Sequence, residues 1–90
     1  MANFVHLHVH SEFSLLDGLG KLDQLIARTK EMGMDTLAIT DHGAMYGSFK
    51  FYLKAKAAGI KPIIGVETYV ARRSRLDKEG KIDTDPYHLV

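Results

Sequence analysis

The sequence contains no cysteine, which excludes disulfides and zinc ribbons and makes the cytoplasm the expected compartment. It also lacks any apolar run near the roughly 18 residues that a membrane-spanning helix needs, so we expect no membrane partner. Residues 1–4 show no basic region followed by an apolar core, and we therefore expect no signal peptide.

An excess of charge of one sign is missing too. The 12 basic and 11 acidic residues leave a formal net charge of +1, so the chain as a whole has no basic signature for nucleic acid. The two halves differ, because residues 1–45 carry three basic and six acidic residues (−3) and residues 46–90 carry nine and five (+4). The acidic half suits a cation site. The basic half suits a phosphate-bearing partner, although solvated lysines on a helix are the simpler explanation.

The chain is short but has the composition of a globular protein. Its 90 residues correspond to one domain or part of one, and 46% hydrophobic with 26% charged residues argue against disorder. Strict alternation predicts a first strand over residues 4–10, with three histidines on one of its faces. The other expected elements are helices at 22–32 and 45–58, strands at 36–40, 62–70 and 87–90, and a charged loop or hairpin at 72–85.

Two glycines are expected to end the two helices. Gly33 and Gly59 each follow a helical apolar pattern, at a position where glycine commonly stops a helix. The buried faces are expected to consist of Leu22, Leu25, Ile26 and Met32 in the first helix and of Met45, Phe49, Tyr52 and Leu53 in the second.

The order of these elements predicts an α/β fold with about four strands and two main helices. Helical crossovers imply parallel strands with the helices outside. A doubly wound sheet and a piece of a β/α barrel both fit this order. Because the sequence stops inside a strand-like run, a fragment of something larger is favoured.

Histidines and a carboxylate follow three successive expected strands. His8 and His10 leave the same face of the first strand near its end. His42 directly follows the second strand, and Glu67 lies near the end of the third. The carboxyl ends of parallel strands meet at one edge, where active sites form in α/β folds. Neutral imidazole and carboxylate suit Zn, Mn or Fe(II), so the pattern predicts a divalent metal site.

Simpler interpretations exist for the neighbouring polar residues. Asp17 precedes Gly18 in a common turn signal. Asp41 could brace its turn or orient His42. His88 lies within a strand-like run outside the cluster and is expected to be structural. The sequence contains no phosphate loop, no dinucleotide fingerprint and no serine or cysteine nucleophile arrangement.

Four motifs resemble those of the polymerase and histidinol phosphatase (PHP) superfamily. They are His-Leu-His-Val-His-Ser at 6–11, Leu-Asp-Gly at 16–18, Ile-Thr-Asp-His-Gly at 39–43 and Gly-Val-Glu at 65–67. The stretches 4–18, 43–47, 59–67 and 86–90 are similar to the opening of the large catalytic subunits of bacterial replicative DNA polymerases. The resemblance covers essentially the whole chain.

The resemblance implies a distorted seven-stranded β/α barrel with up to three metal ions, usually Zn, Mn or Fe. Residues 1–90 would form the incomplete N-terminal part of this PHP domain, and the remaining ligands would follow residue 90. By motif, the implied ligands are His8, His10, Asp17, His42 and Glu67, with Glu67 as the bridging carboxylate and with His6 and Asp41 in supporting positions. Some polymerase members have lost these ligands, whereas all five positions here are competent to bind metal.

The resemblance also implies a function for the parent protein. The parent would be a DNA-directed DNA polymerase of DNA replication, a nucleotidyltransferase, and its PHP part would hydrolyse phosphoesters as a 3′→5′ proofreading exonuclease. The 90-residue piece alone is expected to be inactive. One alternative is a non-catalytic structural module that braces the polymerase and binds a separate proofreading subunit. Another is a free-standing phosphatase similar to histidinol phosphatase.

The implied partners are DNA, dNTPs and the other subunits of a replicative polymerase assembly, with Mg at a polymerase site outside this chain. The chain supplies about four of the seven strands implied by the resemblance, so strand edges remain unpaired. Exposed edges pair with other strands, and an incomplete core is marginal in a short chain. We therefore expect the 90-residue chain to self-associate.

Overall fold

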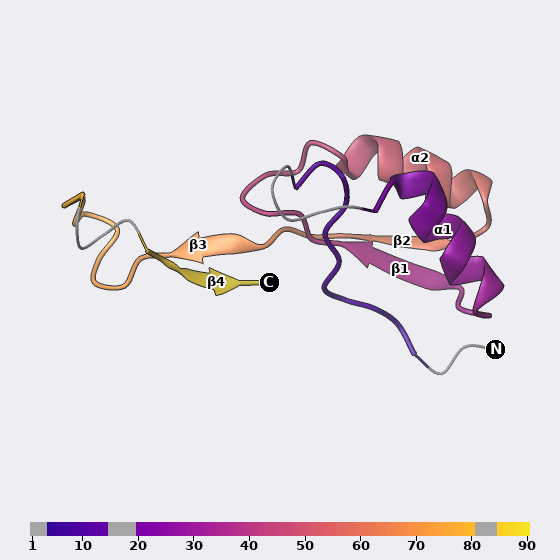
Figure 1. Cartoon of the computed structure of the whole chain (residues 1–90), viewed down its shortest axis with the longest axis horizontal. Coiled ribbons are helices and arrows are strands. Elements are labelled where there is room, and N and C mark those ends of the chain that lie inside the picture. Colours follow the sequence, from indigo (N-terminus) through magenta and orange to yellow (C-terminus); the bar gives the residue numbers. More distant parts are fainter. Residues whose placement is uncertain (1–3, 15–19, 81–84) are drawn as a thin grey trace.

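The computed structural model describes residues 4–14, 20–80 and 85–90 (Figure 1). These residues form α1 (Leu22–Glu31), β1 (Thr36–Ile39), α2 (Ser48–Ala57), β2 (Lys61–Ile64), β3 (Thr68–Val70) and β4 (Tyr87–Leu89). β1 and β2 form a parallel pair, and β3 and β4 form a separate antiparallel pair. Within the described ranges, no helix has both the length and the apolar character needed to span a membrane.

The pair β1–β2 and the two helices form an α/β layer. The two strands run in register from Thr36 opposite Lys61 to Ile39 opposite Ile64, and α2 is the crossover between them. Both helices lie on the same side of this pair in Figure 1. This unit therefore has the parallel strands and outside helix that the order of elements predicts.

Both helices end in the same hydrogen-bonded motif. After α1, the N–H of Gly33 donates to the carbonyl of Lys30, and the N–H of Met34 donates to the carbonyl of Thr29, both at 3.0 Å. α2 ends in the same way at Gly59, with the corresponding bonds at 3.2 and 2.9 Å. Each glycine has a φ of 77°, a left-handed conformation that favours glycine in this Schellman arrangement. The expected helix ends are thus confirmed.

The core lies between the two helices and β1. The expected inward face of α2 is wrong, because Phe51 and Ala55 are buried whereas Phe49 is 73% exposed. The side of α2 that faces solvent is also apolar, so periodicity alone could not identify the inward side. The core residues are Leu22, Ile26, Leu37, Ile39, Phe51, Ala55 and Ile60, while Met32, Met45, Tyr52 and Leu53 are exposed.

The expected strand over residues 4–10 is wrong as a regular strand. The segment runs beside β1, where Ala38 N–H donates to the His6 carbonyl (3.2 Å) and Thr40 N–H donates to the Val9 carbonyl (2.8 Å). A step of two residues along β1 therefore matches a step of three along the segment, as in a bulge. Such a bulge interrupts the ladder and re-aims the side chains on either side of it.

The expected strand over residues 62–70 is wrong as one element, because it divides into β2 and β3. β3 pairs with β4 instead of β1, with Thr68 opposite Leu89 and Val70 opposite Tyr87. The described part of the charged segment 72–85 lies between these two strands, as in a hairpin. Arg72 contacts both the carbonyl and the carboxylate of Asp85. These contacts join the two ends of the connecting loop, next to the end of β3 and the start of β4.

The β3–β4 hairpin projects from the α/β layer (Figure 1). The molecule measures 47 × 24 × 18 Å, and its radius of gyration is 15.3 Å. A compact domain of this length has a radius of gyration of about 12 Å.

Val70, Tyr87 and Leu89 share one face of the hairpin, and all three are exposed. The hairpin therefore presents an apolar face on the side opposite Tyr69 and His88.

Candidate metal centre

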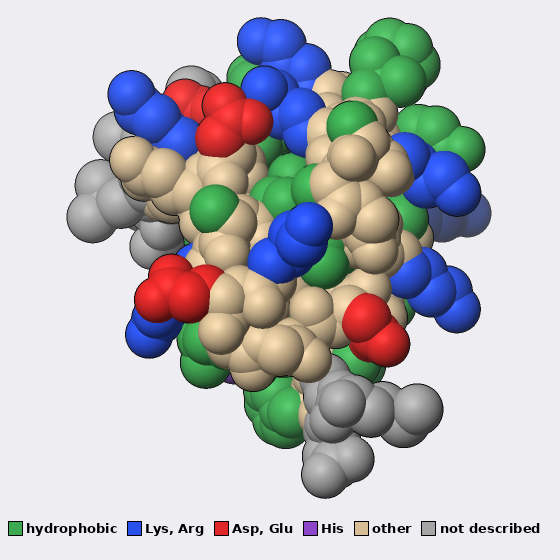
Figure 2. Space-filling model, turned by 90° about the vertical axis from the view of Figure 1, so that its right-hand side faces the viewer, with side chains coloured by type: hydrophobic (Ala, Val, Ile, Leu, Met, Phe, Trp, Pro, Cys, Tyr) green, Lys and Arg blue, Asp and Glu red, His purple; other side chains and the backbone are tan. Residues whose placement is uncertain are grey.

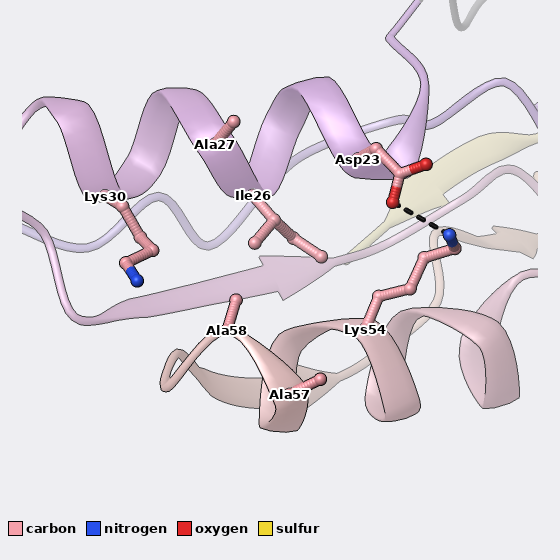
Figure 3. Close-up of a pocket in the computed structure, with 7 residues that line it drawn as sticks. All are labelled: Asp23, Ile26, Ala27, Lys30, Lys54, Ala57 and Ala58. Carbon is pink, nitrogen blue, oxygen red and sulfur yellow. Dashed lines mark hydrogen bonds and ion pairs between the residues drawn. The ribbon is translucent and has the colours of Figure 1, made fainter.

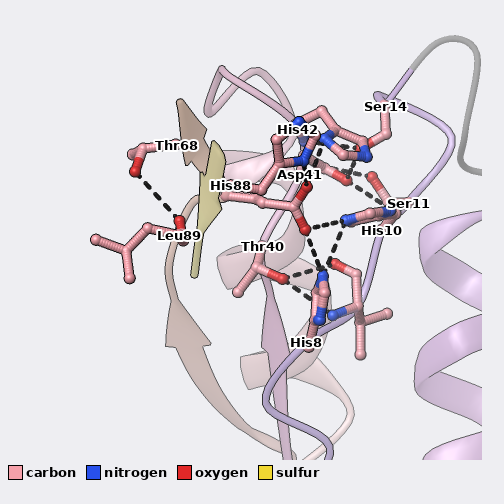
Figure 4. Close-up of polar contacts among 12 residues, drawn as sticks. His8, His10, Ser11, Ser14, Thr40, Asp41, His42, Thr68, His88 and Leu89 are labelled. Atoms are coloured by element: carbon pink, nitrogen blue, oxygen red, sulfur yellow. Dashed lines mark hydrogen bonds and ion pairs between the residues drawn. The ribbon is translucent and has the colours of Figure 1, made fainter. Parts of the chain in front are cut away.

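A buried carboxylate, Glu67, lies among four histidines, and its side chain is 4% exposed. Its Oε1 accepts hydrogen bonds from Nε2 of His8 (2.5 Å) and Nε2 of His10 (3.0 Å). Its Oε2 contacts Nδ1 of His42 and Nδ1 of His88, both at 2.7 Å. Figure 4 shows the four imidazoles converging on one place.

Separate segments of the chain supply these five side chains. His8 and His10 come from the extended segment before β1, and His88 comes from β4. His42 and Glu67 follow β1 and β2, and a parallel bridge pairs the two residues directly. Beside this bridge, the N–H of Glu67 donates to the carbonyl of Asp41 (3.0 Å), and the N–H of Gly43 donates to the carbonyl of Glu67 (2.8 Å). These two bonds continue the β1–β2 ladder past the ends of the strands. The pairing of two parallel strands therefore places the carboxylate next to the imidazole of His42.

The two oxygens of Glu67 divide the histidines into two groups. One group is His8, His10 and Glu67, and the other is His42, Glu67 and His88. Within each group the three candidate ligand atoms lie within 4.8 Å of one another. The groups are adjacent, because the ring centroids of His10 and His42 are 4.0 Å apart. Each group could hold one divalent cation, and Glu67 would then bridge the two.

The surroundings of Glu67 act on its pKa in opposite directions. Burial raises the pKa, whereas hydrogen bonds from His88, His10 and His8 and the charge of His42 lower it. Together these effects bring the pKa from 4.5 to about 2. Glu67 is therefore ionised across the neutral range, which is the form that ligates a metal.

Four of the five ligands expected from the sequence come together in the structure. They are His8, His10, His42 and Glu67. The fifth, Asp17, lies outside the described residues.

The supporting position expected for His6 is wrong. Its ring packs edge-on against Phe4, with 4.8 Å between the centroids, and it lines a pocket with Leu25 and Met34 near α1. The bulge between His6 and Val9 is the physical reason, because strict alternation would have kept His6 on the face of His8.

The contacts of Asp41 fit the bracing role, one of the two roles that the sequence left open for it. Its buried carboxylate accepts hydrogen bonds from Ser11 and Ser14 and so braces the loops around the histidines. Figure 4 shows this set of contacts together with His10 and His42.

His88 was expected to lie outside the cluster, and that expectation is wrong, because the structure brings its ring to Glu67. Its ring contacts Glu67 and lies edge-on to the ring of Tyr69, with 5.2 Å between the centroids. The antiparallel pairing of β3 with β4 places His88 opposite Tyr69. Tyr69 lies two residues after Glu67, so this pairing brings His88 close to the carboxylate. The available sequence signal was a histidine alternating with Tyr87 and Leu89 in a strand-like run.

A groove between α1 and α2 has different chemistry. It encloses about 410 Å³, and Lys54 donates to Asp23 across it at 2.8 Å (Figure 3). Figure 2 shows Lys and Arg side chains spread around the face on the right of Figure 1, which fits solvated helix lysines. The groove is lined by Asp23, Ile26, Ala27, Lys30, Lys54, Ala57 and Ala58.

The comparisons with known proteins agree with the histidine motifs. The family profile of the PHP domain matches residues 6–90. The chain belongs to the PHP domain family.

The relatives point to one kind of PHP protein. The chain is 49% identical over 90 residues to the DNA polymerase III subunit alpha of Borreliella burgdorferi and 51% identical over 94 residues to that of Aquifex aeolicus. It is 52% identical over 91 residues to the DNA polymerase III subunit alpha of Thermus aquaticus. These alignments cover 99%, 98% and 97% of this chain but 8% of each relative. The chain therefore matches a short PHP portion of DNA polymerase III alpha subunits.

A solved structure shares the fold. It is an amidohydrolase from Chromobacterium violaceum with bound sulfate and no metal. The TM-score is 0.68 at 28% sequence identity, and the match covers 93% of this chain and 25% of that chain. The α/β arrangement described above thus occurs within a larger protein of known structure.

Proposed function

We propose that this chain is the opening part of the PHP domain of a DNA polymerase III alpha subunit and that its histidine–carboxylate cluster binds divalent metal. The observation that carries the metal proposal is the buried Glu67, both of whose oxygens contact imidazole nitrogens. Residues 1–90 would form the first units of a distorted seven-stranded barrel. The identity to the polymerase relatives supports this assignment over a free-standing phosphatase.

The proposed ligands form two sets that share one carboxylate. His8, His10 and Glu67 would hold one cation, and His42, Glu67 and His88 would hold a second. Asp17, from the motif resemblance, is proposed as a further ligand. Imidazole nitrogen with carboxylate oxygen suits Zn, Mn or Fe.

The proposed chemistry is phosphoester hydrolysis, as in 3′→5′ proofreading by the parent polymerase. A divalent metal bound here would neutralise charge on a phosphate and lower the pKa of water. Glu67, being ionised, would keep the ligand set anionic at its centre. His8 is the most exposed of the four imidazoles, with 57% of its side chain accessible, so a phosphate would approach from its side.

The partners of the parent protein would be DNA, dNTPs and other polymerase subunits. The parent would act in the cytoplasm and would hold Mg at a separate polymerase site.

The test uses a full-length alpha subunit that carries this chain. We expect the purified subunit to contain metal and to remove nucleotides from a labelled primer 3′ end. His8→Ala should lower both metal content and cleavage by about 10-fold or more, since it removes a ligand. His6→Ala is the matched control, because that histidine lies on the same segment but points towards α1.

The outcomes separate the proposal from its alternative. Primer extension by each variant, measured on the same samples, reports that the protein is folded. Metal without cleavage in the wild type would favour the structural module that braces the polymerase. A wild-type subunit without bound metal would reject the metal centre.

Metal binding should weaken on acidification, because protons compete with the cation for the imidazole nitrogens and only neutral imidazole ligates. The pKa of Glu67 is lowered to about 2, so its carboxylate contributes to stability above about pH 4.5 and loses this contribution only as the pH falls towards 2. The histidines should therefore set the pH at which metal is lost. A titration of affinity against pH checks this, and equal affinity at pH 5 and pH 7.5 would contradict it.

A further inference from the structure

We infer that Asp41 and Ser14 are positioning residues that set the relative placement of the two metal sites. This inference rests on the proposed metal centre. It assigns a function to the buried polar network of Ser11, Ser14 and Asp41, which is formed by side chains other than the proposed ligands.

Asp41 is a buried carboxylate that receives three hydrogen bonds from one loop. It is 2% exposed. Its Oδ1 accepts from the backbone N–H of Ser11 (2.6 Å) and from the hydroxyl of Ser14 (2.8 Å), and its Oδ2 accepts from the hydroxyl of Ser11 (2.8 Å). Three donors fix both the rotamer of Asp41 and the path of the loop that follows His10.

Ser14 connects this carboxylate to the backbone of a proposed ligand. Its hydroxyl donates to Asp41 and accepts a hydrogen bond from the backbone N–H of His42 at 3.0 Å. A hydroxyl has one hydrogen, so donation to Asp41 orients its lone pairs towards His42. Ser14 therefore holds the point at which the chain turns to present His42.

The network spans the boundary between the two proposed sites. Ser11 directly follows His10, which belongs to the group on Oε1 of Glu67, and His42 belongs to the group on Oε2. The two rings are 4.0 Å apart by their centroids. A bridging carboxylate tolerates little change in that separation, and groups behind metal ligands set ligand orientation. The network is therefore placed to hold the two sites at a fixed distance.

The experiment compares Ser14→Ala with Ser74→Ala in the full-length alpha subunit. Ser74 is the matched control, because its hydroxyl also accepts a backbone N–H, that of Leu76 at 3.2 Å, in the segment beyond β3. The probes are Mn²⁺ binding, followed by electron paramagnetic resonance, and the visible absorption of Co²⁺ at saturation. The part of each signal that is lost in a Glu67→Gln subunit is assigned to this centre. The part that remains is assigned to metal elsewhere, including the polymerase site.

Ser14→Ala is expected to weaken Mn²⁺ binding by about 10- to 100-fold and to change the Co²⁺ absorption at saturation. Asp41→Asn should do the same, and Ser74→Ala should match the wild type. A purely structural role would lower the melting temperature and leave the saturated Co²⁺ spectrum unchanged, which would overturn the inference. Wild-type Mn²⁺ affinity in a folded Ser14→Ala subunit would also overturn it while leaving the metal centre intact. No Mn²⁺ signal in the wild type would overturn the metal centre itself.

Discussion

Replacing Glu67 with glutamine is expected to lower the metal affinity of the full-length alpha subunit by about 100-fold or more, beyond the 10- to 100-fold typical of groups behind the ligands. Glu67 is the carboxylate shared by both candidate groups in the described part of the chain. Glutamine keeps the shape but removes the charge, and its NH₂ end presents donors where a cation needs an acceptor. Metal content by mass spectrometry, together with an affinity titration, measures the effect.

The matched control for this variant is Glu79→Gln. Glu79 lies in the charged segment between β3 and β4, and its exposed carboxylate is 3.8 Å from the guanidinium of Arg73. An exposed pair of this kind contributes little, so metal content should stay at the wild-type level. Equal metal affinity in Glu67→Gln and the wild type would show that the cluster is held together for another reason.

The 90-residue chain by itself is expected to be an oligomer at micromolar concentration. The outer face of the β3–β4 hairpin exposes Val70, Tyr87 and Leu89, which are 40%, 53% and 61% accessible. A two-stranded sheet is marginal in water without a packed face. Burying this face against a second copy removes apolar area from water and covers strand edges. Sedimentation velocity or light scattering at several concentrations measures the association.

A pair of leucine variants tests whether the hairpin face drives this association. Leu89→Lys places a charge on that face and should shift the population towards monomer. Leu76→Lys adds the same charge at a leucine that is 75% exposed but lies in the connection between the two strands, and it should leave the association unchanged. A wild-type monomer that unfolds cooperatively would show that the described strands and helices suffice without further covering.

Local features of the sequence were enough to predict several elements. The positions of Gly33 and Gly59 predicted both helix ends, because a left-handed residue there needs glycine whatever the surrounding fold. The order of strands and helices predicted the parallel pair β1–β2, since a helical crossover constrains strand direction. That same constraint placed His42 beside Glu67.

Features that depend on contacts between distant segments could not be predicted in this way. The inward face of α2 is set by which side meets β1 and α1, and its apolar residues do not mark that side. The bulge beside β1 follows from two hydrogen bonds between segments about 30 residues apart, and with it the direction of His6.

The sequence by itself determined the ends of the helices, the parallel arrangement of β1 and β2, and the residue types of the candidate site formed by His8, His10, His42 and Glu67. These follow from local dihedral preferences and from the direction of the chain. The tertiary structure alone decided that residues 62–70 divide into two strands and that His88 joins the cluster. The physical reason is that the antiparallel pairing of β3 with β4 brings His88 to Glu67 across 21 positions of sequence, and no local preference encodes that register.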